Sequence, residues 1–214
     1  MKNILIILFT VMQSTAFCQG LDGKLQIGGN ASFYFNQRQN EDPDNSFVGE
    51  NNYRQQGVSV FPQVGYFIKE NVSVGGRIGY SRSIFDQQII NASRVTVLDS
   101  ESTSSIFRIG PFVRYHIPVT EQFYFFAQAN VEAGFGNTKR TNDENTIEED
   151  VFTFEAGIRP GILFFLTEKV GIEGSFGFLG YHMNNANLNP EPVTITREFG
   201  FEMSSFLIGL QFYL

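Results

Sequence analysis

The chain has 214 residues and a formal net charge of −7, and it contains 24 Phe and 21 Gly but no Trp. A single cysteine excludes a disulfide framework, and an acidic chain without clustered Lys and Arg excludes a nucleic-acid partner, because phosphate binding needs such clusters. This balance of Phe and Gly is unusual for a soluble domain and is typical of a sheet whose aromatic side chains face lipid.

Residues 1–18 have the three parts of an export signal. Lys2 supplies the charged start, residues 4–12 form an apolar run, and small residues follow. The apolar run is too short to cross a bilayer as a helix. We therefore expect cleavage close to Cys18, with acylation of Cys18 as the alternative, and residues 19–214 as one domain.

Beyond the signal, apolar and polar residues alternate in eight segments, which predicts β-strands with one apolar and one polar face. The apolar band in each segment is nine to eleven residues long, the length that a tilted strand needs to cross a bilayer. The predicted strands are residues 25–36, 58–68, 72–80, 107–117, 123–135, 152–166, 170–181 and 206–214.

Alternation would also fit a soluble sandwich, but three features favour a membrane barrel. The apolar faces are aromatic at their ends, short turns alternate with long polar segments, and the other face carries charge and glycine. A soluble barrel of the lipocalin type has the opposite polarity, with apolar residues inside. We predict an all-β fold, an eight-stranded antiparallel up-and-down transmembrane β-barrel with four long outer loops, in which Ala129 faces the bilayer and Gln128 the interior.

A repeat supports this architecture. Pro62, Pro111 and Pro160 are spaced 49 residues apart, and each is followed by an aliphatic residue at plus two and an aromatic residue at plus four. Proline cannot donate to a strand ladder, so we expect a local bulge or kink at each of these positions.

Seven charged residues lie on the faces predicted to point inward. An eight-stranded barrel has an interior that side chains just fill, so charges there must pair. The network forms either a structural plug or a gated path for ions and solutes, and the plug is the preferred interpretation. Its members are Arg77, Arg108, Arg114, Glu132, Glu155, Arg159 and Glu173.

One pairing can be predicted from turn arithmetic. If the turn between the fourth and fifth strands is centred on Thr120, residues whose numbers sum to 240 lie opposite each other. Arg108 then faces Glu132, at a separation that allows an ion pair.

The sequence contains only weak indications of a catalytic site or a metal-binding site. His116 is expected at the rim of the fourth strand, and His182 is too far along its strand from Ser175 for a triad with Glu173. A nucleophile for His182 would have to come from Ser204 or Ser205. Two acidic groups could hold calcium but lack a fixed-spacing motif, so we expect no metal and no cofactor; they are Glu41, Asp42, Asp44 and Glu50, and Glu148, Glu149 and Asp150.

The repeated Pro-x-Val-x-Tyr unit, the turn at residues 69–71 and the ending at residues 209–214 resemble the small porin-like outer-membrane β-barrel domain family, of the outer-membrane protein A transmembrane type. The resemblance implies a Gram-negative outer membrane, with turns and termini in the periplasm and loops outside. It also implies that the barrel-assembly machinery reads the last strand through Leu210, Phe212 and Leu214. Leu214 stands where the family usually has Phe.

These observations lead to one functional hypothesis and two alternatives. We expect a protein that is not an enzyme, that contacts outer-membrane lipids, and that has a structural or surface-interaction role with an unidentified ligand at its outer loops. The alternatives are a narrow porin-like channel and a hydrolase that modifies lipid A.

Overall fold

The computed structural model describes residues 21–41, 50–90, 95–142, 145–187 and 194–214. These residues form eight strands, which confirms the predicted fold class. The strands are β1 (Leu25–Glu41), β2 (Glu50–Lys69), β3 (Val72–Ile90), β4 (Thr96–Pro118), β5 (Phe123–Asn142), β6 (Asn145–Thr167), β7 (Val170–Asn187) and β8 (Thr194–Tyr213).

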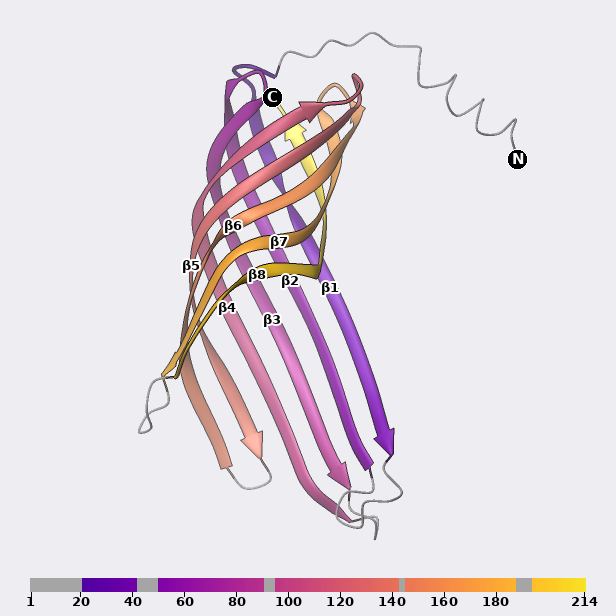
Figure 1. Cartoon of the computed structure of the whole chain (residues 1–214), viewed down its shortest axis with the longest axis vertical. Helices are drawn as coiled ribbons and strands as arrows, with labels where there is room; N and C mark the ends of the chain where they lie inside the picture. The colour runs from indigo at the N-terminus through magenta and orange to yellow at the C-terminus, as the bar shows by residue number, and fades with distance from the viewer. Residues whose placement is uncertain (1–20, 42–49, 91–94, 143–144, 188–193) are drawn as a thin grey trace, which may run out of the picture.

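Each strand pairs antiparallel with its neighbours in sequence, and β8 returns to β1 to close a barrel (Figure 1). Short turns connect β2 to β3, β4 to β5 and β6 to β7, and we call this the short-turn end. Leu25 and Leu214 exchange backbone hydrogen bonds there, at 2.8 and 2.9 Å. Within the described ranges, no helix is long and apolar enough to span a bilayer.

The strands continue well beyond the apolar bands at the opposite end. β3 runs to Ile90 and β4 begins at Thr96. The expectation of four long loops is wrong for most of these segments, because β5 and β6 pair as far as Asn142 and Asn145. Outside the bilayer both faces of a strand meet water, so alternation fades while backbone pairing continues.

The two faces of the sheet divide as the alternation predicts. Ala129 is exposed on the outer surface, whereas Gln128 is 3% exposed inside the barrel. The outward positions carry exposed aliphatic and aromatic side chains along every strand, including Leu210, Phe212 and Leu214 at the end of the chain. Such a surface is stable only against an apolar medium.

The three repeated prolines interrupt pairing on one side. The ladder to the next strand skips Pro62 and Pro111 without a change of register, whereas at Pro160 the register shifts between Ile158 and Gly161. Because proline has no N–H to donate, each interruption lies where a ladder bond would be missing. The ladder is therefore irregular at Pro160, where the extra residue lies on the neighbouring strand β7, between Ser175 and Leu179, and the other two positions are gaps in the ladder.

Candidate functional site: the lumen

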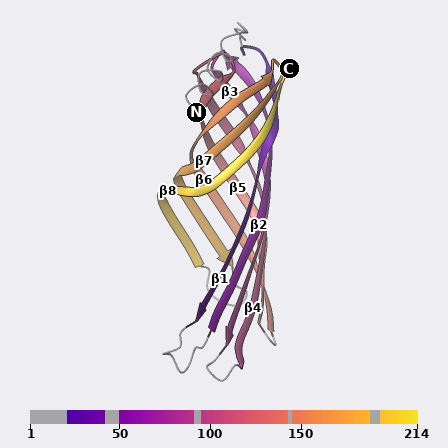
Figure 2. The same ribbon diagram turned by 90° about the vertical axis from the view of Figure 1, so that its right-hand side faces the viewer.

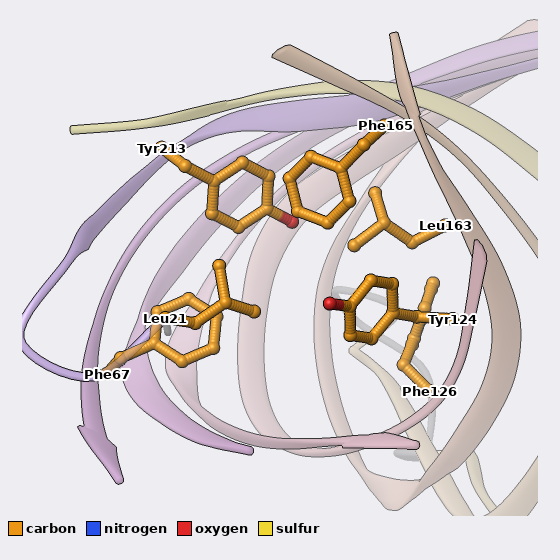
Figure 3. Packing of buried hydrophobic residues seen from close by; sticks show 7 residues of the cluster. All are labelled: Leu21, Phe67, Tyr124, Phe126, Leu163, Phe165 and Tyr213. Carbon is orange, nitrogen blue, oxygen red and sulfur yellow. The ribbon is translucent and has the colours of Figure 1, made fainter. Parts of the chain in front are cut away.

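A layer of apolar side chains fills the lumen at the short-turn end (Figure 3). Rings from β5, β6 and β8 meet there, with centroids 4.8 Å apart for Phe165 and Tyr213 and 5.4 Å apart for Tyr124 and Phe165. The rings are tilted or edge-on, the arrangements that aromatic pairs prefer. We call this layer the aromatic floor; its members are Leu21, Phe67, Tyr124, Phe126, Leu163, Phe165 and Tyr213.

His116 packs against the aromatic floor and is not a rim residue, which corrects the prediction. It is 0% exposed, and its ring lies 5.0 Å from Phe67 and 6.4 Å from Phe126. Its side chain points inward, as the alternation along β4 predicts for this position. The His116 backbone N–H donates to the Asn71 carbonyl, so β4 stays paired up to the turn. The histidine thus packs as an aromatic ring inside the barrel.

Above the floor, Arg114 and Glu173 form a buried ion pair. Arg114 Nη1 lies 2.6 Å from Glu173 Oε2, and Nη2 donates to Oε1 at 3.3 Å. Arg114 Nε donates to Gln128 Oε1 at 2.7 Å, and the guanidinium lies 4.2 Å from the centroid of Phe126. The two charges are thus held by a two-bond fork and an added hydrogen bond, the arrangement that a desolvated pair requires.

A second ion pair lies next to the first. Arg77 Nη1 contacts Glu132 Oε1 at 3.0 Å, and both side chains are 3% exposed. Asn30 connects the two layers, since it accepts from Arg77 Nη2 and donates to Glu173 Oε1, both at 3.2 Å. Four of the seven predicted inward charges are therefore brought together in one network.

The predicted pair of Arg108 with Glu132 is wrong. In the β4–β5 ladder Arg108 lies opposite Gly134, and Pro118 pairs with Tyr124, so the turn is centred one residue later than Thr120. Within the turn, the backbone N–H groups of Val119 and Thr120 both donate to the Phe123 carbonyl. When the centre of the turn moves by one residue, each β4 residue lies opposite a β5 residue two positions further along the chain. Arg108 therefore does not face Glu132, and Glu132 forms its ion pair with Arg77.

The remaining predicted charges line a cavity of about 850 Å³ in the outer half of the lumen. Arg108 Nη1 donates to Ser81 Oγ at 2.8 Å, and Arg159 Nη1 donates to the Gly177 carbonyl at 3.0 Å. Glu155 Oε2 lies 3.9 Å from His182 Nδ1. These groups are part-buried and do not fill the lumen as the two ion pairs do.

Sequence reasoning missed the neutral amides that complete the network. Besides Asn30 and Gln128, Gln26 Nε2 donates to Gln211 Oε1 and Ser73 Oγ donates to Gln26 Oε1, both at 3.2 Å. Their signal was present, because all of them occupy inward positions of the alternating pattern.

The parts of a hydrolase triad do not come together. Glu173 is held by Arg114, Ser175 is 2% exposed, and His182 lies in the outer part of β7 opposite Glu155. The side chains of Ser204 and Ser205 fall outside the described part of the molecule, as do Asp42 and Asp44. Among the described residues, no group of three or more His, Cys, Asp or Glu could hold a metal ion.

Comparison with known proteins identifies the kind of barrel. Residues 4–201 match the model of a family described as outer membrane protein beta-barrel domain. No significant match to a curated protein sequence was found.

Three solved barrels are distantly similar in structure. The N-terminal β-barrel domain of Pseudomonas aeruginosa OprF is 13% identical with a TM-score of 0.37, covering 90% of this chain and 98% of its own. Ail, the attachment invasion locus protein of Yersinia pestis, is 13% identical with a TM-score of 0.39, covering 90% of this chain and 99% of its own. OprG from Pseudomonas aeruginosa is 12% identical with a TM-score of 0.42, covering 90% and 96%.

Proposed function

Because the chain belongs to the outer membrane protein beta-barrel domain family and lies in the outer membrane, we propose that it is a non-conducting barrel with a structural or surface-interaction role. The observation that supports this function is the filled inner half of the lumen. The aromatic floor and the ion pair of Arg114 with Glu173 occupy consecutive levels. An ion moving along the barrel axis would have to displace both.

The energetics of the plug favour a closed state. Separating a buried ion pair leaves an uncompensated charge, which costs roughly 3–5 kcal/mol. The aromatic floor would also have to give up its ring contacts. A barrel of eight strands has no spare width around these side chains.

The outer parts of the strands supply the surface for interaction. Hairpins such as β5–β6 extend past the apolar band, with Arg140 57% exposed and 3.6 Å from Glu149. Because these strands stay paired, they hold their side chains in a fixed arrangement on the outside of the cell. We infer that any ligand or partner binds to these extensions.

The experiment that tests the proposal is current recording in planar bilayers that contain the purified protein. The parent protein should insert without steady conductance steps. A variant that combines Phe67→Ala, Phe165→Ala and Glu173→Ala should show openings, because it lacks part of the floor and one charge of the plug. Steady steps in the parent protein would contradict the proposal and favour the narrow channel.

A hydrolase is disfavoured by the occupation of Glu173, and it has a direct test. Lipid A from cells with and without the gene should have the same mass spectrum. Loss of an acyl chain only in cells that carry the gene would overturn the non-enzymatic role.

A further inference from the structure

The barrel closes between β1 and β8 over a short distance only. Pairing runs from Gln26 opposite Tyr213 to Ala31 opposite Ile208, whereas β2 and β3 stay paired out to Glu50 and Ile90. Beyond Ala31, β8 turns away from β1 and follows β7, as both views show (Figures 1 and 2). Among the described residues, this outer part of β1 has no partner on the β8 side, and we call the opening the seam.

The seam opens where three adjacent strands are irregular. The β6–β7 register shifts at Pro160, and the β7–β8 register shifts between Phe176 and Phe178. Gly177 lies within both irregularities and has a φ of 69°. Bulges bend strands and increase their twist, so β6, β7 and β8 curve together away from the straighter β1.

The cavity of the outer lumen lies directly behind the seam. Its lining includes Phe33 from β1 and Phe206 and Ile208 from β8, which are the two flanks of the opening. The buried pair of Arg77 with Glu132 also lines the cavity, and the plug lies below that pair. Its volume of about 850 Å³ falls within the range of roughly 300–1,000 Å³ that is usual for small-molecule sites.

The rim of this cavity is apolar and its walls are charged. Phe33 is 74% exposed and Ile208 is 60% exposed on the lipid-facing side of the seam. Behind them, Arg108 has no carboxylate within ion-pair distance among the described residues, and its Nε has no hydrogen-bond partner there. Its Nη1 donates to Ser81 Oγ, but a part-buried guanidinium without a carboxylate partner favours a carboxylate, which it can bind with two hydrogen bonds.

The seam also requires the cavity to contain water. The free edge of β1 presents backbone N–H and C=O groups at the level of lipid-facing side chains, where a lipid-exposed strand edge is not tolerated unless it lines a water-filled cavity. Water behind an apolar rim suits a molecule with a polar head and an apolar tail. Since Glu155 and Glu202 also line the cavity, a singly charged head is favoured over a doubly charged one.

We propose that the seam and cavity form a binding site for a single-chain anionic amphiphile of the fatty-acid class. Its carboxylate is held by Arg108, and its alkyl chain leaves through the seam between Phe33 and Phe206 into the bilayer. This site goes beyond the proposed non-conducting role, because the plug closes the axis of the barrel whereas the seam opens to its side.

The test uses the absence of tryptophan from the chain. Phe206→Trp places a single fluorophore on the seam, and Phe125→Trp places one on the lipid-facing side of β5, at a residue that does not line this cavity. Both variants are reconstituted in phosphatidylcholine nanodiscs and titrated with brominated hexadecanoate, which quenches nearby tryptophan. We expect saturable quenching in Phe206→Trp, and only weak quenching that rises linearly in Phe125→Trp.

A second substitution tests the head group. Arg108→Gln in the Phe206→Trp protein should raise the half-saturating concentration by about tenfold or more, because a charge-assisted hydrogen bond is lost. Arg82→Gln is the matched control, since Arg82 is an exposed arginine on β3. Brominated methyl hexadecanoate, which has no charge, should bind both proteins equally.

Three outcomes would overturn the proposal. Equal quenching in the two tryptophan variants would mean partition into the bilayer only. A titration unaffected by Arg108→Gln would mean that the head group is not held by this arginine. Equal saturation by brominated phosphatidylcholine would assign the seam to ordinary bilayer lipid.

Discussion

At the scale of single residues, Arg114 is the side chain on which the plug depends most. It is 0% exposed, and it meets Glu173, Gln128 and the ring of Phe126. A charge in such a place is tolerated only because its partners are fixed by two other strands, β5 and β7. Removing either charge of the pair therefore has a larger effect than removing both.

This relation can be measured as a double-mutant cycle. Arg114→Met and Glu173→Gln should each lower the free energy of unfolding in lipid vesicles by roughly 3–5 kcal/mol. The double variant should lose clearly less than the sum of the two. Arg82→Met, at an exposed arginine on β3, is the control and should cost under about 1 kcal/mol; additive losses at Arg114 and Glu173 would mean that they do not act as a pair.

The lipid-facing surface makes a second residue-scale prediction. Ala129→Arg places a charge in the middle of the outward apolar band and should lower the free energy of unfolding by roughly 2–4 kcal/mol. Thr141→Arg lies on the exposed outer part of the same strand, where the cost should be about 0–1 kcal/mol. Urea unfolding in vesicles gives both values, and equal costs would show that the membrane boundary lies elsewhere.

The sequence predicts which charges point inward but not which of them meet. The inward set follows from a period of two residues, and the plug members Arg114 and Glu173 were both recognised in this way. Their pairing depends on barrel closure, because β4 and β7 are not neighbours. The pairing of Arg108 was predicted wrongly because it depended on the centre of one turn, which composition leaves undetermined.

At the scale of strands, the shared bend of β6, β7 and β8 distinguishes one side of the barrel from the other. Gly177 allows this bend, since a φ of 69° lies in the left-handed region that residues with a Cβ avoid. A Cβ at this position would also lie 3.1 Å from the Glu202 carbonyl oxygen. The bend is thus encoded locally, at a residue with no side chain.

Gly177→Ala should lower the free energy of unfolding by about 1–2 kcal/mol, the cost of a left-handed conformation with a Cβ. Gly174→Ala is a matched control on the same strand, because a Cβ there meets Phe206 at an ordinary 3.6 Å. Chemical unfolding of both variants makes the comparison. A loss in Gly174→Ala as large as that in Gly177→Ala would show that the backbone conformation is not the cause.

The seam predicts a pattern of backbone protection. Beyond Ala31, the β1 amides that point toward β8 should exchange with solvent much faster than those bonded to β2. Hydrogen exchange of the protein in nanodiscs, read residue by residue, makes this measurement, with the doubly paired β3 as the internal standard. Uniform protection along β1 would mean that β1 and β8 form backbone hydrogen bonds along their whole length in the membrane, so that the seam is closed.

The strands themselves could be predicted where lipid and lumen impose opposite demands on alternate residues. Their outer ends could not, since exposed acidic residues such as Glu148 and Asp150 have the sequence pattern of a loop and nevertheless belong to β6. The prolines show the same limit. A gap in the ladder at Pro111 and a bulge at Pro160 look alike in sequence, because the difference lies in the neighbouring strand.

At the scale of the whole molecule, the lumen is divided into two parts. The half toward the short turns is filled by the aromatic floor and the two ion pairs, whereas the outer half holds a cavity that opens at the seam. The family places this barrel in the outer membrane. The molecule is therefore expected to be accessible from outside the cell and closed toward the inside.

Thiol labelling at two depths tests this division most directly. In a Cys18→Ala background, Ser59→Cys lines the cavity, and Ser73→Cys lies in the filled half, where the serine is 0% exposed. Intact cells are treated with a membrane-impermeant thiol reagent, and labelling is read by mass spectrometry. Ser59→Cys should react and Ser73→Cys should not; rapid labelling of both would show a lumen open along its length and would contradict the plug.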